Sequence, residues 1–175
     1  MKTKEAQIKA FGALEAADIE AALAIKAAST DGASCFDDTT RSRMEAMLDL
    51  TFQPKAFSGA AISPSIRICA AALELWGASR IKDIEGARRF IDFGGCDPED
   101  VMLMWSAGTE RARLHEFAAA GITKVEVCAS GCDDDAEACR ADADKVYRLE
   151  NAPELPHLVD PDEEMPCRCI LISKS

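Results

Sequence analysis

Five of the eight cysteines in this 175-residue chain lie within its last 48 residues. They are Cys128, Cys132, Cys139, Cys167 and Cys169. A structural zinc ion takes a tetrahedral set of soft ligands, commonly two that are close in sequence and two from a distant segment. The stretch "CASGCDDDAEAC" can supply one pair of thiolates, and "CRC" before the final apolar run can supply the other. This spacing predicts a zinc ion that closes the loop between the two stretches.

His157, in the stretch "ELPHLVD", is the one histidine near these cysteines and is a sixth candidate ligand. The sequence contains no C-x2-C pair, so it leaves open which four of the six side chains bind the metal. Two alternatives to zinc remain: disulfides that join Cys132 or Cys139 to the CRC pair, and free thiols. The three earlier cysteines are expected to pack in the core as small hydrophobic side chains. These are Cys35, Cys69 and Cys96.

Helical patterns fill the chain up to about residue 121. Apolar residues recur at three- and four-residue steps over 4–28, and shorter helices are expected over 40–50, 62–77 and 82–95. Ser63 is expected to cap the third of these helices and Pro64 to begin it. The stretch over 96–121 gives the clearest helix: Asp97 caps it, Pro98 begins it and Gly121 ends it.

Short alternating segments replace the helices after residue 121. Strands are expected over 122–128, 145–150 and 167–173, with one or two helical turns within 133–144 and a proline-rich loop over 151–166. Such a tail buries little apolar area, and zinc can contribute on the order of 10 kcal/mol to its folding. The chain is therefore predicted to be mainly α, with a helical domain over 1–121 and a small zinc-stabilised α+β module over 122–175.

The chain carries a net charge of −11, and its lysines and arginines are scattered along the sequence. Binding to nucleic acid needs clustered cations that displace counterions, so no nucleic-acid partner is expected. Residues 122–175 hold thirteen acidic and six basic side chains. We expect this acidity to be solvated surface, or else a docking face for a basic protein partner.

The N-terminal stretch is charged and amphipathic, and no secretory or transit signal stands out in it. No run of apolar residues is long enough to span a membrane. Cysteines in such a chain are expected to stay reduced and available to a metal. The expected location is therefore cytoplasmic.

The motifs of common enzyme classes do not occur in the sequence: H-E-x-x-H, a Walker loop, G-x-G-x-x-G after a strand and G-x-S-x-G. His115 is expected to be an ordinary helix-surface histidine rather than a general base. The acidic runs over 133–135 and 160–164 lack the pattern of a calcium or magnesium site. A zinc ion with four protein ligands has no open position, which favours a structural role. Three cysteines and a water would instead permit hydrolysis.

The C-terminal stretch resembles the cysteine-rich module of phage minor head, or head-morphogenesis, proteins and related bacterial proteins. The helix before it also looks like the "TE-x-x-R" stretch that precedes that module, at Thr109-Glu110-Arg111. The other matching features are Ala118–Gly121, Cys139-Arg140-Ala141, Lys145-Val146-Tyr147, Ala152-Pro153, Leu155-Pro156-His157 and Cys167-Arg168-Cys169. Residues 1–95 show no resemblance to a known family.

Three departures separate this chain from the pattern. Ala136 stands where the first cysteine of the family's C-x2-C knuckle belongs, and Asp144 replaces the usual glycine before Lys145. A third family cysteine in the proline-rich loop is missing, and His157 is its nearest replacement. These departures leave the identity of the fourth ligand open.

The resemblance implies a non-enzymatic, zinc-binding structural protein of phage or prophage origin, linked to head morphogenesis and able to associate with the virion. Its partners would be proteins, such as capsid or portal components. Two other functions stay open: a metal-dependent nuclease or hydrolase with an open zinc site, and a thiol switch in which CRC cycles between dithiol and disulfide.

Overall fold

The computed structural model describes residues 6, 9, 38–57, 59–76, 91–129, 131, 136–157, 167 and 169–174. The helix expected over 4–28, most of the one expected over 82–95, Cys35 and Cys132 lie outside these residues. The chain forms two compact units. The first comprises Met1–Phe52 and Ile62–Gly108, and the second comprises Gln53–Ala61 and Thr109–Ser175. The sequence places the boundary near residue 121, whereas the unit that holds the sheet begins at Thr109 and includes a short earlier segment.

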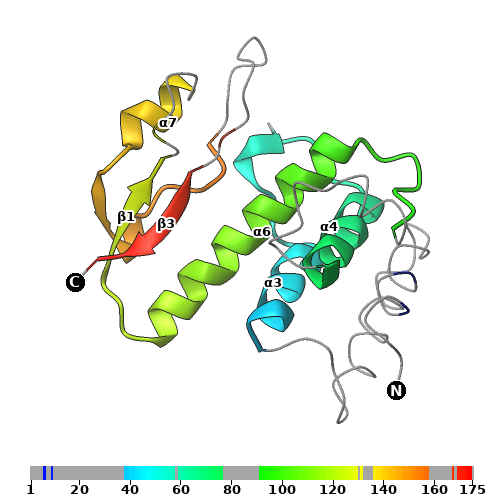
Figure 1. The fold of residues 1–175 in the computed structure, drawn as a ribbon, viewed down its shortest axis with the longest axis horizontal. Helices are drawn as coiled ribbons and strands as arrows, with labels where there is room; N and C mark the ends of the chain where they lie inside the picture. Colours follow the sequence, from blue (N-terminus) through cyan, green and yellow to red (C-terminus); the bar gives the residue numbers. More distant parts are fainter. Residues whose placement is uncertain are drawn as a thin grey trace. The chain divides into compact units, whose positions relative to one another are not determined.

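The described helices of the first unit are α3 (Asp38–Leu48), α4 (Pro64–Trp76) and the first part of α6 (Pro98–Ala119) (Figure 1). The last two begin directly after the residues that the sequence marks as caps, whereas α3 covers 38–48 where the sequence predicts 40–50. The Ile66 amide donates to Ser63 Oγ at 3.3 Å, and the Glu99 amide donates to Asp97 Oδ1 at 2.9 Å. Both caps satisfy amides that the first helical turn leaves unpaired, and both confirm the predicted helix starts.

Helix α6 ends at the predicted glycine. Gly121 has a φ of +74°, which an L-residue with a side chain rarely adopts. The Ile122 amide donates back to the Phe117 carbonyl at 2.9 Å, which is the six-to-one bond of a Schellman motif. The chain can therefore turn sharply from the helix into the first strand.

Arg67 of α4 is completely buried in the first unit. Its Nη1 donates to the carbonyls of Met47 and Asp49 at 3.3 and 2.9 Å, and its Nη2 donates to the Phe52 carbonyl at 2.6 Å. These carbonyls belong to the end of α3 and the turn that follows. A cation at this position satisfies them and also complements the negative end of the helix dipole.

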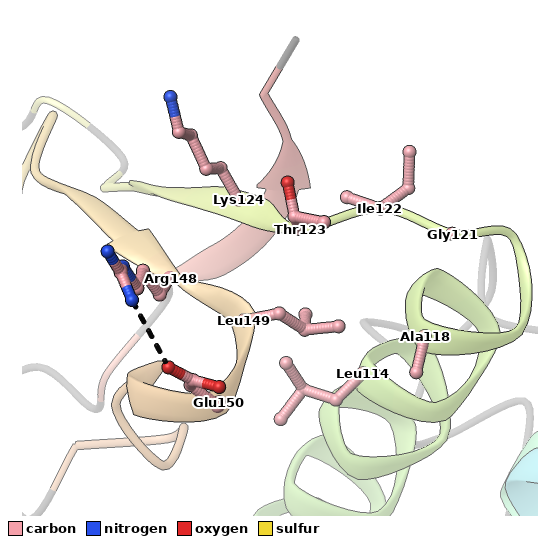
Figure 2. A pocket seen from close by; sticks show the side chains of 9 residues that line it. All are labelled: Leu114, Ala118, Gly121, Ile122, Thr123, Lys124, Arg148, Leu149 and Glu150. Atoms are coloured by element: carbon pink, nitrogen blue, oxygen red, sulfur yellow. Dashed lines mark ion pairs between the residues drawn. The ribbon is translucent and has the colours of Figure 1, made fainter.

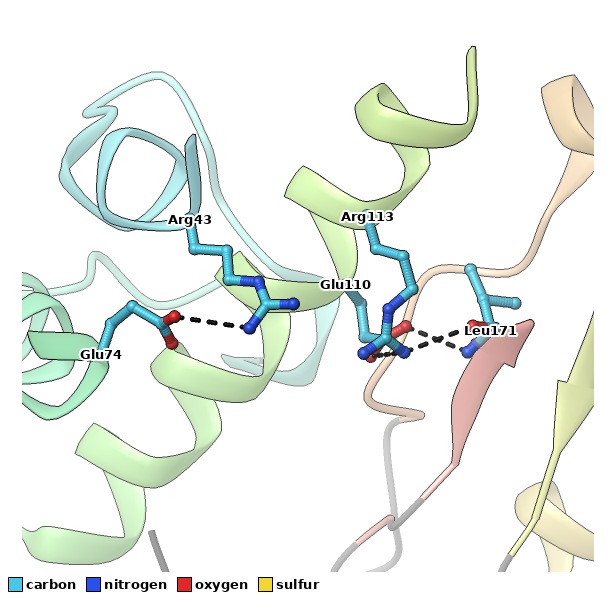
Figure 3. A network of polar contacts seen from close by, with 5 residues as sticks. All are labelled: Arg43, Glu74, Glu110, Arg113 and Leu171. Atoms are coloured by element: carbon cyan, nitrogen blue, oxygen red, sulfur yellow. Dashed lines mark hydrogen bonds and ion pairs between the residues drawn. The ribbon is translucent and has the colours of Figure 1, made fainter. Parts of the chain in front are cut away.

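A second buried charge in this unit is the carboxylate of Glu74, which is 4% exposed. The Trp105 indole donates to it at 2.8 Å, and Arg43 Nη1 lies 3.4 Å away, as Figure 3 shows for the arginine. Helix α6 also approaches Met47 of α3 closely at Gly108, where an added Cβ would overlap the Met47 side chain. Glycine at this position is needed for that approach.

The second unit contains a three-stranded antiparallel sheet in the order β2-β1-β3. Its elements are η1 (Lys55–Phe57), the second part of α6, β1 (Lys124–Cys128), α7 (Glu137–Asp142), β2 (Val146–Arg148), η3 (Leu149–Asn151) and β3 (Ile170–Ser173). Val125, Val127 and Leu171 on the inner face are at most 1% exposed, and Leu114 and Phe117 of α6 pack against this cluster. The predicted fold class, mainly α with a small α+β module, is confirmed. No helix in the described ranges is long and apolar enough to cross a membrane.

Asp144, which stands where the family pattern has glycine, occupies the same kind of backbone conformation that glycine would. Its φ is +60°, and its amide donates to the Val127 carbonyl at 2.9 Å. Aspartate is among the few residues with a side chain that tolerate this left-handed region. This departure from the pattern therefore preserves the turn from α7 into β2.

Two side chains of α6 hold the outer edge of β3. The Val127 amide donates to the Lys145 carbonyl, and the Val127 carbonyl accepts from the Asp144 amide, so both groups point toward β2. Leu171 lies opposite Val127 on β3 in a pair without mutual hydrogen bonds, and its amide and carbonyl therefore point away from β1. The Leu171 amide donates to Glu110 Oε2 at 3.1 Å. Arg113 Nη1 donates to the Leu171 carbonyl at 3.3 Å and to Glu110 Oε1 at 2.7 Å (Figure 3). Glu110 and Arg113 have the spacing of the glutamate and arginine in TE-x-x-R.

We expect Glu110→Ala to lower the free energy of unfolding of the second unit by about 2–3 kcal/mol. The substitution leaves the buried Leu171 amide without its acceptor and Arg113 without its carboxylate. Glu110→Gln keeps an acceptor and should cost less. Urea unfolding measures both, and Glu150→Ala, at a side chain that is 72% exposed, is the control. Equal stabilities of the Glu110→Ala and Glu150→Ala proteins would contradict the assigned role.

Candidate metal centre

Four potential ligands converge in the second unit. The Sγ atoms of Cys139, Cys167 and Cys169 and a ring nitrogen of His157 all lie within 4.8 Å of one another. Zinc bonds of about 2.3 Å in a tetrahedron place their ligand atoms about 3.8 Å apart, so only small side-chain shifts are needed to close this set around an ion. These four residues can coordinate a metal ion.

The four candidate ligands come from three segments, and buried neighbours hold each segment in place. Cys139 lies in α7 and is 1% exposed, and Cys169 directly precedes β3 and is 3% exposed. Leu171, two residues after Cys169, carries the backbone groups that α6 holds. Leu155, two residues before His157, is itself buried in the core of the unit. Each ligand segment is therefore fixed by apolar packing or hydrogen bonds next to the ligand.

The loop that carries His157 has a further anchor. Glu154 Oε1 accepts a hydrogen bond from the Lys55 amide at 2.6 Å. This contact explains why residues 53–61 belong to the second unit although they lie far away in sequence. The sequence gives no sign of this link, because it depends on the fold of both segments.

His157 faces the thiols with one ring nitrogen and a carboxylate with the other. Its Nδ1 lies 3.5 Å from Cys167 Sγ, and its Nε2 lies 3.0 Å from Asp142 Oδ2. Metal-binding histidines commonly donate their second ring N–H to a carboxylate, which fixes the tautomer and the ring orientation. This arrangement leaves Nδ1 as the metal-binding atom and Nε2–H as the donor to Asp142.

Asp142 is in turn held by Tyr147 and Lys145. The Tyr147 hydroxyl donates to Asp142 Oδ1 at 2.6 Å, and Lys145 Nζ lies 3.4 Å from the same oxygen. The hydrogen bond from Tyr147 is the main cause that lowers the pKa of Asp142. Burial opposes this effect, and the hydrogen bond with His157 lowers the pKa further. The carboxylate is therefore ionised at neutral pH and ready to accept from the imidazole.

Sequence reasoning missed Asp142 as part of the site. The sequence does place Asp142 near the site, because residues three apart on a helix share a face and Asp142 lies three residues after the candidate ligand Cys139. Tyr147 lies within a stretch that the family resemblance covers, although the resemblance assigned it no role.

Burial controls the thiol chemistry of the CRC pair. Burial is the main cause that raises the pKa of Cys167 to about 11. Burial also raises the pKa of Cys169, and electrostatic repulsion from the Cys167 thiolate adds to that rise. Without a cation these thiols are protonated at neutral pH. Metal binding requires the thiolates, so uptake of an ion releases protons.

Of the other candidate cysteines, Cys128 is not part of this cluster. The Cys128 thiol bonds to the adjacent Ala129 carbonyl at 3.8 Å. Cys132 lies outside the described residues. Ala136, at the position of the missing knuckle cysteine, is 3% exposed and packs in the core of the unit. Cys69 is buried as expected, and His115 is exposed on α6. The six described cysteines are free thiols: Cys69, Cys96, Cys128, Cys139, Cys167 and Cys169.

We expect Asp142→Ala to weaken zinc binding by about 10–100-fold without abolishing it. The four ligands stay in place, but the imidazole loses the acceptor that fixes its tautomer and orientation. Competition with a chromophoric chelator measures the affinity. Glu137→Ala removes an equal charge from an exposed position of the same helix and serves as the control. An equal loss in the control would assign the effect to charge rather than to orientation.

Comparison with known proteins gives no further guide to this site. No protein-family model matches the chain, and neither a curated protein nor a solved structure matches it. The distinguishing feature of the site is its donor set, three thiols and one imidazole that Asp142 orients.

Proposed function

We propose that the second compact unit is a zinc-stabilised structural module and that the protein acts by binding other proteins rather than by catalysis. The observation that carries the proposal is the convergence of four donor atoms from three separate segments within 4.8 Å. Three thiolates and an imidazole suit zinc, whereas calcium and magnesium prefer oxygen ligands.

The number of donors favours structure over hydrolysis. A tetrahedral zinc ion with Cys139, His157, Cys167 and Cys169 as ligands has no open position for a water or a substrate. The nuclease or hydrolase alternative needs one of these four side chains to stay off the metal. Asp142 argues against this, because it orients His157 toward the thiols.

The size of the core supports a structural role for the metal. Among the residues that the structure describes, the buried apolar cluster of the second unit has seven members, and two of them, Cys139 and Cys169, are themselves candidate ligands. Such a small core leaves a module marginally stable on apolar burial alone. A zinc ion that links α7, the His157 loop and β3 supplies the missing free energy, on the order of 10 kcal/mol.

The resemblance to phage head-morphogenesis proteins supports a role in head assembly, with capsid or portal proteins as partners. Two departures from the family pattern are compatible with it. Asp144 has the backbone conformation of the glycine that it replaces, and His157 supplies a fourth donor where a cysteine is missing.

Elemental analysis of protein purified without chelator or oxidant tests the zinc module, and we expect one zinc ion per chain. Replacement by Co²⁺ should give the visible absorption of a tetrahedral site with thiolate ligands. Metal well below one equivalent, or a cobalt spectrum typical of octahedral oxygen ligands, would disprove the proposal. Co-sedimentation with assembled heads, after co-expression with the portal and capsid proteins of the same genome, tests the role in assembly separately.

A further inference from the structure

The outer face of the sheet in the second unit carries an apolar patch. The pairing places Val146 and Ile172 on either side of Glu126, and Ile170 beside Cys128. Val146, Ile170 and Ile172 are 48%, 42% and 37% exposed, although the solvent side of an antiparallel sheet normally carries polar residues. Three of the four exposed large apolar side chains of the described residues therefore lie on this one face.

The same face ends in a group of cations. Lys124 pairs with Arg148 across β1 and β2, and the Lys174 amide donates to the Lys124 carbonyl from the other side. The Arg148 and Lys174 side chains are 78% and 48% exposed. Lys174 pairs with Glu126, and Arg148 pairs with Glu150 at 3.7 Å. Three cations against two carboxylates leave a charge of +1 here, in a chain whose net charge is −11.

We propose that this outer face docks an acidic amphipathic segment of a partner protein. Aliphatic side chains of the segment would pack on Val146, Ile170 and Ile172, and carboxylates at one end would meet Lys124, Arg148 and Lys174. The apolar residues provide the driving force, because burying aliphatic surface is favourable at about 25 cal/mol per Å². The cations set the orientation and the charge of the partner.

A pocket beside the cationic end adds a place for an anchoring side chain. It has a volume of about 800 Å³, and Lys124 and Arg148 contribute to its lining together with Leu114, Leu149 and Ile122. Figure 2 shows the Leu114 and Leu149 side chains close to one another, while Lys124 extends away from them. An apolar side chain next to an acidic residue would match this combination of an apolar floor and a charged rim.

The overall negative charge of the protein allows an experiment to distinguish specific docking on this face from general electrostatic attraction. A chain with a net charge of −11 attracts basic peptides through its general field, and that attraction needs no specific surface. A preference for an acidic segment is expected only if the local cations on this face dominate. The inference is independent of the metal assignment, because none of the four metal-site residues contributes to the face.

The test uses the zinc-loaded full chain and two labelled helical peptides of equal length and leucine content, one with glutamate and one with lysine on the polar face. Fluorescence anisotropy should show the glutamate peptide binding more tightly, with an affinity that falls as salt increases. Lys124→Glu/Arg148→Glu should weaken it at least tenfold. Val146→Thr/Ile172→Thr should also weaken it, since threonine keeps the β-branched shape and removes the apolar contact.

Leu50→Thr changes an exposed aliphatic residue in the first unit, at 58% exposure, and should leave binding unchanged. Zinc content and far-ultraviolet circular dichroism confirm that each variant is folded, so loss of binding is distinct from loss of the metal module. Three results would overturn the proposal: equal or tighter binding of the lysine peptide, no binding of either peptide, and a dimer in sedimentation that Val146→Thr/Ile172→Thr dissociates.

Discussion

Cys169→Ser is expected to release zinc and unfold the second compact unit, while the helices of the first unit stay folded. Serine has nearly the size of cysteine, but its hydroxyl is a poor zinc ligand at neutral pH. Zinc contributes on the order of 10 kcal/mol to folding a small module, which is comparable with the whole stability of a typical domain. A strong chelator added to the unaltered protein should have the same effect.

Cys128→Ser is the matched control, because Cys128 lies in β1 of the same unit but is not part of the four-residue cluster, and its thiol donates to the adjacent Ala129 carbonyl. It should keep one equivalent of zinc. Elemental analysis gives the metal content. Amide hydrogen exchange reports the two units separately, and protection should be lost in β1, α7, β2 and β3 and kept in α3 and α4. Full zinc occupancy and full protection in the Cys169→Ser protein would show that Cys169 is not a ligand.

Arg67→Met should lower the free energy of unfolding of the first unit by about 3–5 kcal/mol. Methionine fills much of the space but offers no donor to the carbonyls of Met47, Asp49 and Phe52, which accept from Arg67. Each buried acceptor left without a partner costs about 1–3 kcal/mol, and water at the partly buried end recovers some of this. Urea unfolding measures the change as a lower midpoint with an unaltered slope.

Arg41→Met is the control for this prediction. Arg41 lies on α3 in the same unit, and its Nη1 is 3.5 Å from the almost fully exposed carboxylate of Asp38. An exposed pair of this kind contributes well under 1 kcal/mol. Arg67→Lys should fall between the two variants, because a single ammonium group cannot reach carbonyls spread over this turn. A midpoint for Arg67→Met equal to that of Arg41→Met would refute the role of Arg67.

Local signals were sufficient to predict where α4 and α6 begin and where α6 ends. Ser63, Asp97 and Gly121 each act through bonds to residues at most four positions away, so their effects are visible in the sequence alone. Arg67 gave no such signal, because an arginine within an apolar helix is explained only by the carbonyls that another segment brings to it.

The candidate site was predictable in part. The two stretches that supply Cys139, Cys167 and Cys169 were identified from cysteine density, but the choice among the remaining candidates depends on strand geometry. Val125 and Val127 face inward, so alternation along β1 turns Cys128 to the opposite face. His157 reaches the thiols because Leu155 is buried, and no spacing rule describes that loop.

The contact between α6 and Leu171 also has a consequence for solubility. An edge strand with unpaired backbone groups can pair with an identical strand from another molecule, and repetition of that step builds a fibre. Glu110 and Arg113 occupy the amide and the carbonyl at the middle of β3, so a strand from a neighbouring molecule would have to displace two charged groups. Glu110 and Arg113 therefore oppose the addition of a further strand to the sheet at high protein concentration.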